Sequence, residues 1–437
     1  MPRDTVLQGP ALSKNPPEQS SDNAAIRIDH HGKQLVLTWE QVSRGLLAVG
    51  APGFGKTVSL LQIAEELRSK ASDDDVFIFF DTKGDYLSRL HMPGDKILSY
   101  GNDATVYWNI FEDIAADGCD EDLLYDNAYE IATMLFSDKI ANSQNPFFPK
   151  NGRDIVMGLL YSFVLHGQQD DTFKSRMVNN KALAGFFRQY FSSRNIIQEL
   201  TRYPRTSGIV TSISTGDANA SLTPQTQGVL SEAAEVGREI FKGGFAREGY
   251  FSIRQFVRNK GAKALFIEYD MALGNTLLPI YRTLCDISLK EALSRNCNSN
   301  GGRVYVFMDE MRLLPQLAYL ENAINFGRGM GLTVIAGIQN SSQIAQVYGD
   351  HAMRSILDSF GTMLIFNTAN GETRRLLEDR IGKNTRYEST ASMRGAIEEK
   401  KVVSNVVEDW DIATLGKGKC IVHTIGTNPY FYQFPNR

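Results

Sequence analysis

The residues best suited to chemistry lie at positions 50–57, which read GAPGFGKT. This is the G-x-x-x-x-G-K-[ST] pattern, in which backbone N–H groups of a glycine-rich turn surround a polyphosphate. Lys56 would contact the β- and γ-phosphates, and the hydroxyl of Thr57 would bind Mg²⁺. The candidate binding residues are Gly50, Ala51, Pro52, Gly53, Phe54, Gly55, Lys56 and Thr57.

Two carboxylates follow the apolar run 304–308, which reads VYVFM. We expect Asp309 to hold Mg²⁺ through its water shell and Glu310 to activate the attacking water as general base. Acidic residues are also common at strand ends that have no catalytic role. Hydrolysis, however, needs a carboxylate-bearing strand beside the phosphate loop. The pair therefore predicts nucleotide hydrolysis in addition to binding.

Two further polar residues flank the strand pattern 333–337. Gln339 follows it, where an amide could sense the γ-phosphate; a solvated loop glutamine fits the same spacing. Arg328 precedes it on a helix-to-strand connection, where a guanidinium could reach a neighbouring subunit's nucleotide as an arginine finger. A surface helix arginine is the alternative. The residue pattern leaves both alternatives open.

These side chains need strands and helices to position them. The apolar run 46–49 (LLAV) precedes the glycine-rich turn, an amphipathic helix is expected over 57–70, and 76–80 (VFIFF) is a second buried strand. The helical crossover makes the two strands parallel. The second strand brings Asp81 and Lys83, in DTKGDY, to the ligand-facing edge of the sheet, without assigning them a role.

The chain alternates between two kinds of pattern. Helical spacings dominate from about 120 to 239, whereas strand patterns return at 264–268, 304–308, 333–337 and 363–366. We therefore predict an α/β nucleotide-binding domain interrupted by an all-α insertion. The predicted divisions are a flexible leader (1–25), the first part of the nucleotide-binding domain (26–118), the all-α insertion domain (119–245) and the second part of the nucleotide-binding domain (246–437).

Composition excludes several classes of protein. The 437 residues are 42% hydrophobic and 22% charged, which rules out disordered and collagen-like chains. A formal charge of −4 gives no bulk basic excess, so any nucleic-acid site must be local. The four cysteines lack metal-ligand spacing, and about 18 consecutive apolar residues occur nowhere, so we expect a soluble, cytoplasmic chain. The charged stretch 374–401 predicts mainly a solvated helical face, with DNA contact as the alternative.

Several segments together resemble the coupling proteins of conjugative type IV secretion, the TraG/TraD/TrwB group. These are GAPGFGKT, FFDTKGDYLSRL, YWNIFEDI, FSIRQFV and FMDEMRLLPQLAYLENAINFGRGMGLTVIAGIQNSSQIAQVYG. The last is the most specific, because it extends well beyond a generic phosphate loop. The resemblance implies a RecA-like P-loop domain with an inserted all-α domain. It also implies an ATPase that uses ATP and Mg²⁺ to move single-stranded DNA, with its attached relaxase, toward the secretion channel.

The resemblance also implies roles, partners and location. By position it gives Lys56 and Thr57 to phosphate and Mg²⁺, Asp309 and Glu310 to metal and water activation, Gln339 to sensing, and Arg328 to catalysis in trans. The implied partners are single-stranded DNA, relaxase or another secreted protein, components of the type IV secretion channel, and further copies in a homohexamer. Family members usually have N-terminal helices that anchor them in the inner membrane; this sequence shows none.

Two other functions fit the same motifs. The first is a nucleotide-gated receptor that recruits relaxase or effector proteins without pumping. The second is a cytosolic duplex DNA pump of the FtsK or HerA type. Nucleotide turnover distinguishes the three, because single-stranded DNA should stimulate a coupling motor, duplex DNA a duplex pump, and neither a receptor.

Overall fold

A large sheet forms the centre of the computed structural model, which describes residues 6–18, 22–101, 103–213, 222–294, 297, 301–314, 316–391 and 397–436. Within the described residues its strands, in spatial order, are β14 (Tyr430–Gln433), β13 (Lys419–Thr424), β10 (Thr362–Ile365), β4 (Leu46–Val49), β9 (Leu332–Ile338), β8 (Val304–Met308), β5 (Val76–Asp81), β7 (Lys263–Glu268) and β6 (Lys96–Leu98). The strands from β10 to β6 pair in parallel, and β13 and β14 are antiparallel. The carboxyl ends of the parallel strands therefore share one edge.

Both faces of this sheet are covered. In β5, Val76, Ile78 and Phe80 join one hydrophobic core, whereas Phe77 and Phe79 join the other. Apolar side chains on both sides of a strand are typical of a parallel sheet between two layers of helices. Helix α2 (Lys56–Ser69) and the hairpin β2–β3, within residues 24–38, contribute to the core of one face. Helix α13 (Gly274–Ala292) and the helices α15 to α18, which lie between residues 320 and 381, contribute to the core of the other. Because both faces are buried, the strands are recognisable in the amino-acid sequence as short apolar runs.

The elements covering the sheet agree with the predicted α/β pattern. A hairpin precedes β4 and consists of β2 (Ala24–His30) and β3 (Lys33–Thr38), which pair antiparallel. Among the described residues, the α-helices outside 110–259 are α1 (Trp39–Ser43), α2 (Lys56–Ser69), α3 (Asp85–Leu90), α13 (Gly274–Ala292), α15 (Leu320–Phe326), α16 (Ser341–Tyr348), α17 (Asp350–Ser359), α18 (Gly371–Ile381) and α19 (Asp409–Ala413).

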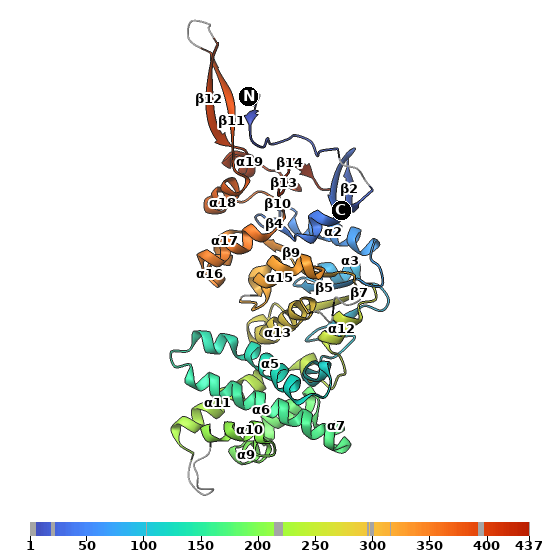
Figure 1. The fold of residues 1–437 in the computed structure, drawn as a ribbon, viewed down its shortest axis with the longest axis vertical. Helices are drawn as coiled ribbons and strands as arrows, with labels where there is room; N and C mark the ends of the chain where they lie inside the picture. Colours follow the sequence, from blue (N-terminus) through green and yellow to red (C-terminus); the bar gives the residue numbers. More distant parts are fainter. Residues whose placement is uncertain are drawn as a thin grey trace.

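The described residues between β6 and β7 are mainly helical. We call residues 110–259 the helical part; Figure 1 shows its helices α5 to α11 gathered at one end of an elongated molecule. Its α-helices are α4 (Ile110–Ile114), α5 (Glu121–Asn142), α6 (Phe147–Gln169), α7 (Asp171–Met177), α8 (Asn180–Gly185), α9 (Ser193–Leu200), α10 (Pro204–Ser207), α11 (Pro224–Ile240) and α12 (Ile253–Asn259). Among the described helices, none combines the length and apolarity needed to cross a membrane. The predicted boundaries at 118/119 and 245/246 stay a prediction.

Parts of the segment predicted as a flexible leader make backbone contacts with the end of the chain and with β11 (Lys383–Ala391). Strand β1 (Val6–Gln8) pairs with β11 (Lys383–Ala391). The N–H of Ser13 donates to the carbonyl of Pro429 at 2.8 Å, and the carbonyl of Ser13 accepts from the N–H of Phe431 at 3.0 Å. Backbone groups, which every residue carries, make these contacts, and the flexibility of the leader stays a prediction. Polar composition does not reveal them.

The charged stretch 374–401 was predicted to be mainly a solvated helical face, but most of its described residues form strands. Only its beginning belongs to helix α18; the chain then forms β11 and β12 (Ile397–Asn405), which pair antiparallel and build a sheet with β1. Figure 1 shows this ribbon at the end of the molecule opposite the helical part. Gly382, with φ +93°, follows α18 in a conformation that favours glycine. Charge content indicated exposure but not the type of element.

Candidate nucleotide-binding site

The phosphate loop lies between the end of β4 and the start of α2. Gly53 and Gly55 have φ values of +83° and +107°, which L-residues with side chains rarely adopt. At Gly50 the reason is space, because a Cβ would lie 2.5 Å from the Cβ of Phe366 at the end of β10. The glycines of the motif thus serve the sharp turn and a close approach between neighbouring strands.

Lys56 is the first residue of α2 and is only 8% exposed. Its ammonium donates to the carbonyls of Gly50, at 2.5 Å, and Ala51, at 3.2 Å. Burial lowers the pKa of Lys56, and the charges of Asp309 and Glu310 oppose that shift. The ammonium therefore spans the inside of the loop, where phosphate oxygens would replace the carbonyls as acceptors.

Thr57 and Asp309 meet although they follow different strands. The Thr57 hydroxyl donates to Oδ2 of Asp309 at 2.5 Å. The other carboxylate oxygen, Oδ1, is buried and has no hydrogen-bond partner among the described residues. Burial raises the pKa of Asp309, while the hydrogen bond from Thr57 and the charge of Lys56 lower it. Oxygen donors and an unsatisfied carboxylate oxygen fit Mg²⁺, which prefers oxygen ligands.

A glycine that was not singled out as a site residue makes room for this carboxylate. Gly337 lies on β9, between the strands that lead to the phosphate loop and to Asp309. A Cβ there would lie 2.2 Å from the backbone oxygen of Asp309 and 2.8 Å from its Oδ1. Glycine inside an apolar strand pattern often marks such a close approach. That signal was present in the sequence TVIAG.

Glu310 and Gln339 are also brought together. The side-chain amide of Gln339 donates to Oε1 and Oε2 of Glu310, with both distances 3.2 Å. Because β8 and β9 are parallel neighbours, the residues that follow their carboxyl ends lie side by side. The side chains of Glu310 and Gln339 are therefore in direct contact.

Arg328 lies elsewhere. It belongs to the short helical turn Gly327–Met330 before β9, so it is at the opposite edge of the sheet from Gln339. Its guanidinium is half exposed and lies 3.3 Å from Glu40, whose carboxylate also pairs with Arg44 at 2.8 Å. Arg328 is thus distant in the fold from the phosphate loop of its own chain. Its predicted action on a neighbouring subunit's nucleotide remains a prediction.

Asp81 and Lys83, both expected at the ligand-facing edge of the sheet, have different environments in the structure. Asp81 is buried and accepts the N–H groups of Lys83, at 3.3 Å, and Leu87, at 2.8 Å, so it stabilises the start of α3. Lys83 is exposed, and its charge lowers the pKa values of Lys56 and Asp309. Lys83 therefore adds positive potential to the site, whereas Asp81 serves the fold.

The end of the chain forms a cavity beside the phosphate loop. Its volume is about 310 Å³, and its lining residues are Gly55, Val58, Ser59, Lys417, Gly418, Phe434, Pro435 and Asn436. The N–H of Gly418 donates to the carbonyl of Phe54 at 3.0 Å, which fixes the closing segment against the loop. The sequence reasoning missed this wall because it carries no motif. The cavity adjoins the start of α2, where the remainder of a nucleotide would extend from its phosphates.

Comparison with known proteins gives one family and one curated relative. Residues 30–409 match the family described as the type IV secretion-system coupling protein DNA-binding domain. Coupling protein TraD of Escherichia coli (strain K12) is 22% identical over 340 residues. The match covers 76% of this chain and 43% of TraD, so the chain spans less than half the length of that relative.

Solved structures share the fold. The bacterial conjugative coupling protein TrwBdeltaN70, in its unbound monoclinic form, has a TM-score of 0.77 at 20% identity, covering 100% of this chain and 95% of that one. Plasmid coupling protein TrwB in complex with ADP and Mg²⁺ has a TM-score of 0.73 at 20% identity, with 100% and 97% covered. The predicted RecA-like α/β fold with an all-helical part is confirmed.

Proposed function

The chain belongs to the family of type IV secretion-system coupling proteins, and we propose that it is an ATP-hydrolysing motor of such a system. One observation carries the proposal. The phosphate loop, the contact between Thr57 and Asp309, and the contact between Glu310 and Gln339 are assembled at a single edge of the sheet. This arrangement contains both a phosphate-binding loop and a carboxylate, that of Glu310, which can serve as base.

Each side chain has a distinct part in the proposed hydrolysis. Lys56 neutralises the β- and γ-phosphates, and Thr57 with Asp309 would hold Mg²⁺. Bound there, Mg²⁺ would neutralise charge that develops on the phosphate oxygens. Glu310 accepts a proton from the attacking water, and Gln339 holds the carboxylate of Glu310 and responds to the γ-phosphate.

The proposed cargo is single-stranded DNA with its relaxase, moved through a ring of identical subunits toward the secretion channel. The family name, which specifies a DNA-binding domain, supports DNA as a partner. In a ring, the same interface repeats head to tail until it closes. Such an interface joins unlike edges of neighbouring subunits, and Arg328 lies at the edge opposite the phosphate loop.

Arg328→Ala is expected to slow hydrolysis by about 10²-fold in assembled rings, because the transition state loses one charged donor. The measurement is the steady-state ATPase rate per subunit over a range of protein concentrations. Arg89→Ala is the matched control, since Arg89 is also a surface arginine paired with one glutamate, Glu65, at 3.1 Å. Full-rate hydrolysis by a monomer that is insensitive to Arg328→Ala would refute action in trans.

The proposed function predicts a specific response to nucleic acid. The ATPase rate per subunit should rise with protein concentration and rise further with single-stranded DNA, because a motor couples turnover to its track. The assay compares single-stranded DNA, duplex DNA of the same sequence and no DNA. Equal rates in all three would favour the receptor that recruits proteins without pumping. Greater stimulation by duplex DNA would favour a pump of the FtsK or HerA type.

A further inference from the structure

The segment after Glu310 is tied to the helix that follows Gln339. Tyr348 is the last residue of α16, which begins two residues after Gln339. Its hydroxyl accepts from the N–H of Leu317 at 3.0 Å and donates to the carbonyl of Leu314 at 3.5 Å. Glu310 and Gln339 are therefore linked by their own contact, and residues that follow each of them are linked through Tyr348.

The same segment is held by α13. Asp286 is 1% exposed, and its two carboxylate oxygens accept the N–H groups of Ala318, at 3.1 Å, and Tyr319, at 3.2 Å. These bonds fix the backbone directly before the side chain of Tyr319. The position of the Tyr319 ring thus follows the position of the segment that begins at Glu310.

Tyr319 reaches the helical part. Its hydroxyl donates to Oε1 of Glu130, on α5, at 2.7 Å. Burial and the bond to Glu130 raise the pKa of Tyr319, so the hydroxyl stays protonated and remains a donor. Residues 130 and 319 are far apart in sequence, and the bond connects the segment after β8 to α5, which packs against α13.

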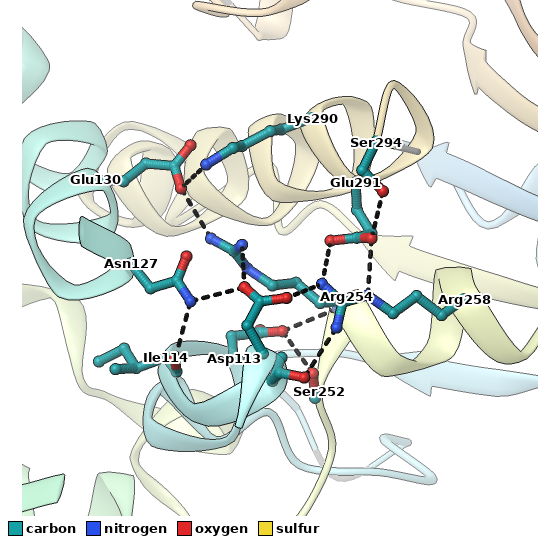
Figure 2. A network of polar contacts seen from close by, with 12 residues as sticks. Asp113, Ile114, Asn127, Glu130, Ser252, Arg254, Arg258, Lys290, Glu291 and Ser294 are labelled. Atoms are coloured by element: carbon teal, nitrogen blue, oxygen red, sulfur yellow. Dashed lines mark hydrogen bonds and ion pairs between the residues drawn. The ribbon is translucent and has the colours of Figure 1, made fainter. Parts of the chain in front are cut away.

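Glu130 also belongs to a largely buried network of charged side chains between α5, α12 and α13. Its Oε2 accepts from Arg254 of α12 at 2.8 Å and from Lys290 of α13. Figure 2 shows Glu130, Arg254 and Lys290 converging, with Arg258 and Glu291 nearby. Arg258 pairs with Glu291 at 2.8 Å and with Asp117 at 2.6 Å. Arg254 is 3% exposed, so water cannot easily replace a lost carboxylate partner. A displacement of the Tyr319 hydroxyl therefore changes the balance of partners around Glu130.

We propose that Tyr319 is a positioning residue that transmits the nucleotide state from Glu310 and Gln339 to α5 of the helical part. The inference rests on the proposed function, because it requires that nucleotide binds beside Glu310. The γ-phosphate moves residues 311–314 and 316–319, and Tyr319 alters the hydrogen bonding of Glu130. Coupling of this kind is reciprocal, so disturbing the bond also changes nucleotide affinity.

Tyr319→Phe removes the hydroxyl and retains the ring, so it tests this bond with little change in packing. The readout is hydrogen exchange of the amides in α5, in the full chain, with and without Mg²⁺ and a nonhydrolysable ATP analogue. In the unaltered protein the analogue should change exchange in α5. In Tyr319→Phe that change should fall by at least about fivefold, the lower end of typical coupling.

Two comparisons make the experiment decisive. Tyr203→Phe is the matched control, because the Tyr203 hydroxyl bonds Gln169 within the helical part at 3.4 Å; the response should persist. Asp286→Asn loosens the backbone contact independently and should also weaken the response. An undiminished response in Tyr319→Phe, or analogue binding with no response in the unaltered protein, would overturn the inference alone. Failure of the unaltered protein to bind the analogue would overturn the proposed function and the inference with it.

Discussion

Glu310→Gln is expected to bind ATP with nearly unaltered affinity and to hydrolyse it about 10²–10⁴-fold more slowly. In the unaltered protein the Gln339 amide donates to both carboxylate oxygens of Glu310 at 3.2 Å. The substitution preserves the size of the side chain and one carbonyl acceptor for that amide. An amide, however, cannot accept the proton of the attacking water. Single-turnover hydrolysis measures the chemical step, and a titration with a fluorescent nonhydrolysable analogue measures binding.

A second glutamate distinguishes this effect from a general loss of charge. Glu321 lies on α15 and accepts from the Ser355 hydroxyl at 3.0 Å, away from the phosphate loop. Glu321→Gln should therefore leave both hydrolysis and affinity unchanged. Normal turnover in Glu310→Gln would show that Glu310 is not the general base, because an amide cannot accept the proton.

Lys56→Ala is expected to lose both hydrolysis and tight nucleotide binding. Removing a charged donor from phosphates typically lowers kcat by about 10²–10³-fold, and here the same group also contacts the ground-state phosphates. The buried ammonium donates hydrogen bonds to the carbonyls of Gly50 and Ala51, inside the phosphate loop. Lys83 is exposed and lies on a different loop, so its charge does not substitute for that contact. Titration with the analogue and steady-state turnover measure the two losses separately.

Lys70 provides the corresponding control. It follows the other end of α2 and pairs with Glu66 at 3.2 Å, so Lys70→Ala changes the charge of the chain equally without touching the loop. This variant should retain turnover and affinity. Turnover of Lys56→Ala within a fewfold of the unaltered protein would show that the loop does not bind the reacting phosphates.

The central strands could be predicted because their signal is local. The expected runs 46–49 and 304–308 coincide with β4 and β8, and the other expected strands agree with the observed ones within about two residues. Each is a short apolar run, since the sheet is covered on both faces. Strand identity also placed Asp309 and Gln339 at carboxyl ends, which is sufficient to bring them to one edge.

What escaped prediction depends on contacts between distant residues. The order of strands, with β9 between β4 and β8, determines that Gly337 faces Asp309, and no local pattern specifies that order. The wall formed by Gly418 and Phe434 likewise depends on where the end of the chain packs. The bond between Tyr319 and Glu130 joins two ordinary polar residues, so only the folded structure reveals it.

The most direct test of the central claim is a crystal structure of the chain with Mg²⁺ and a nonhydrolysable ATP analogue. The expected result is that the ammonium of Lys56 leaves the carbonyls of Gly50 and Ala51 for the β- and γ-phosphates, and that Asp309 gains a metal or a metal-bound water at Oδ1. An analogue bound elsewhere, or a phosphate loop that stays closed on Lys56 at saturating analogue, would contradict the account.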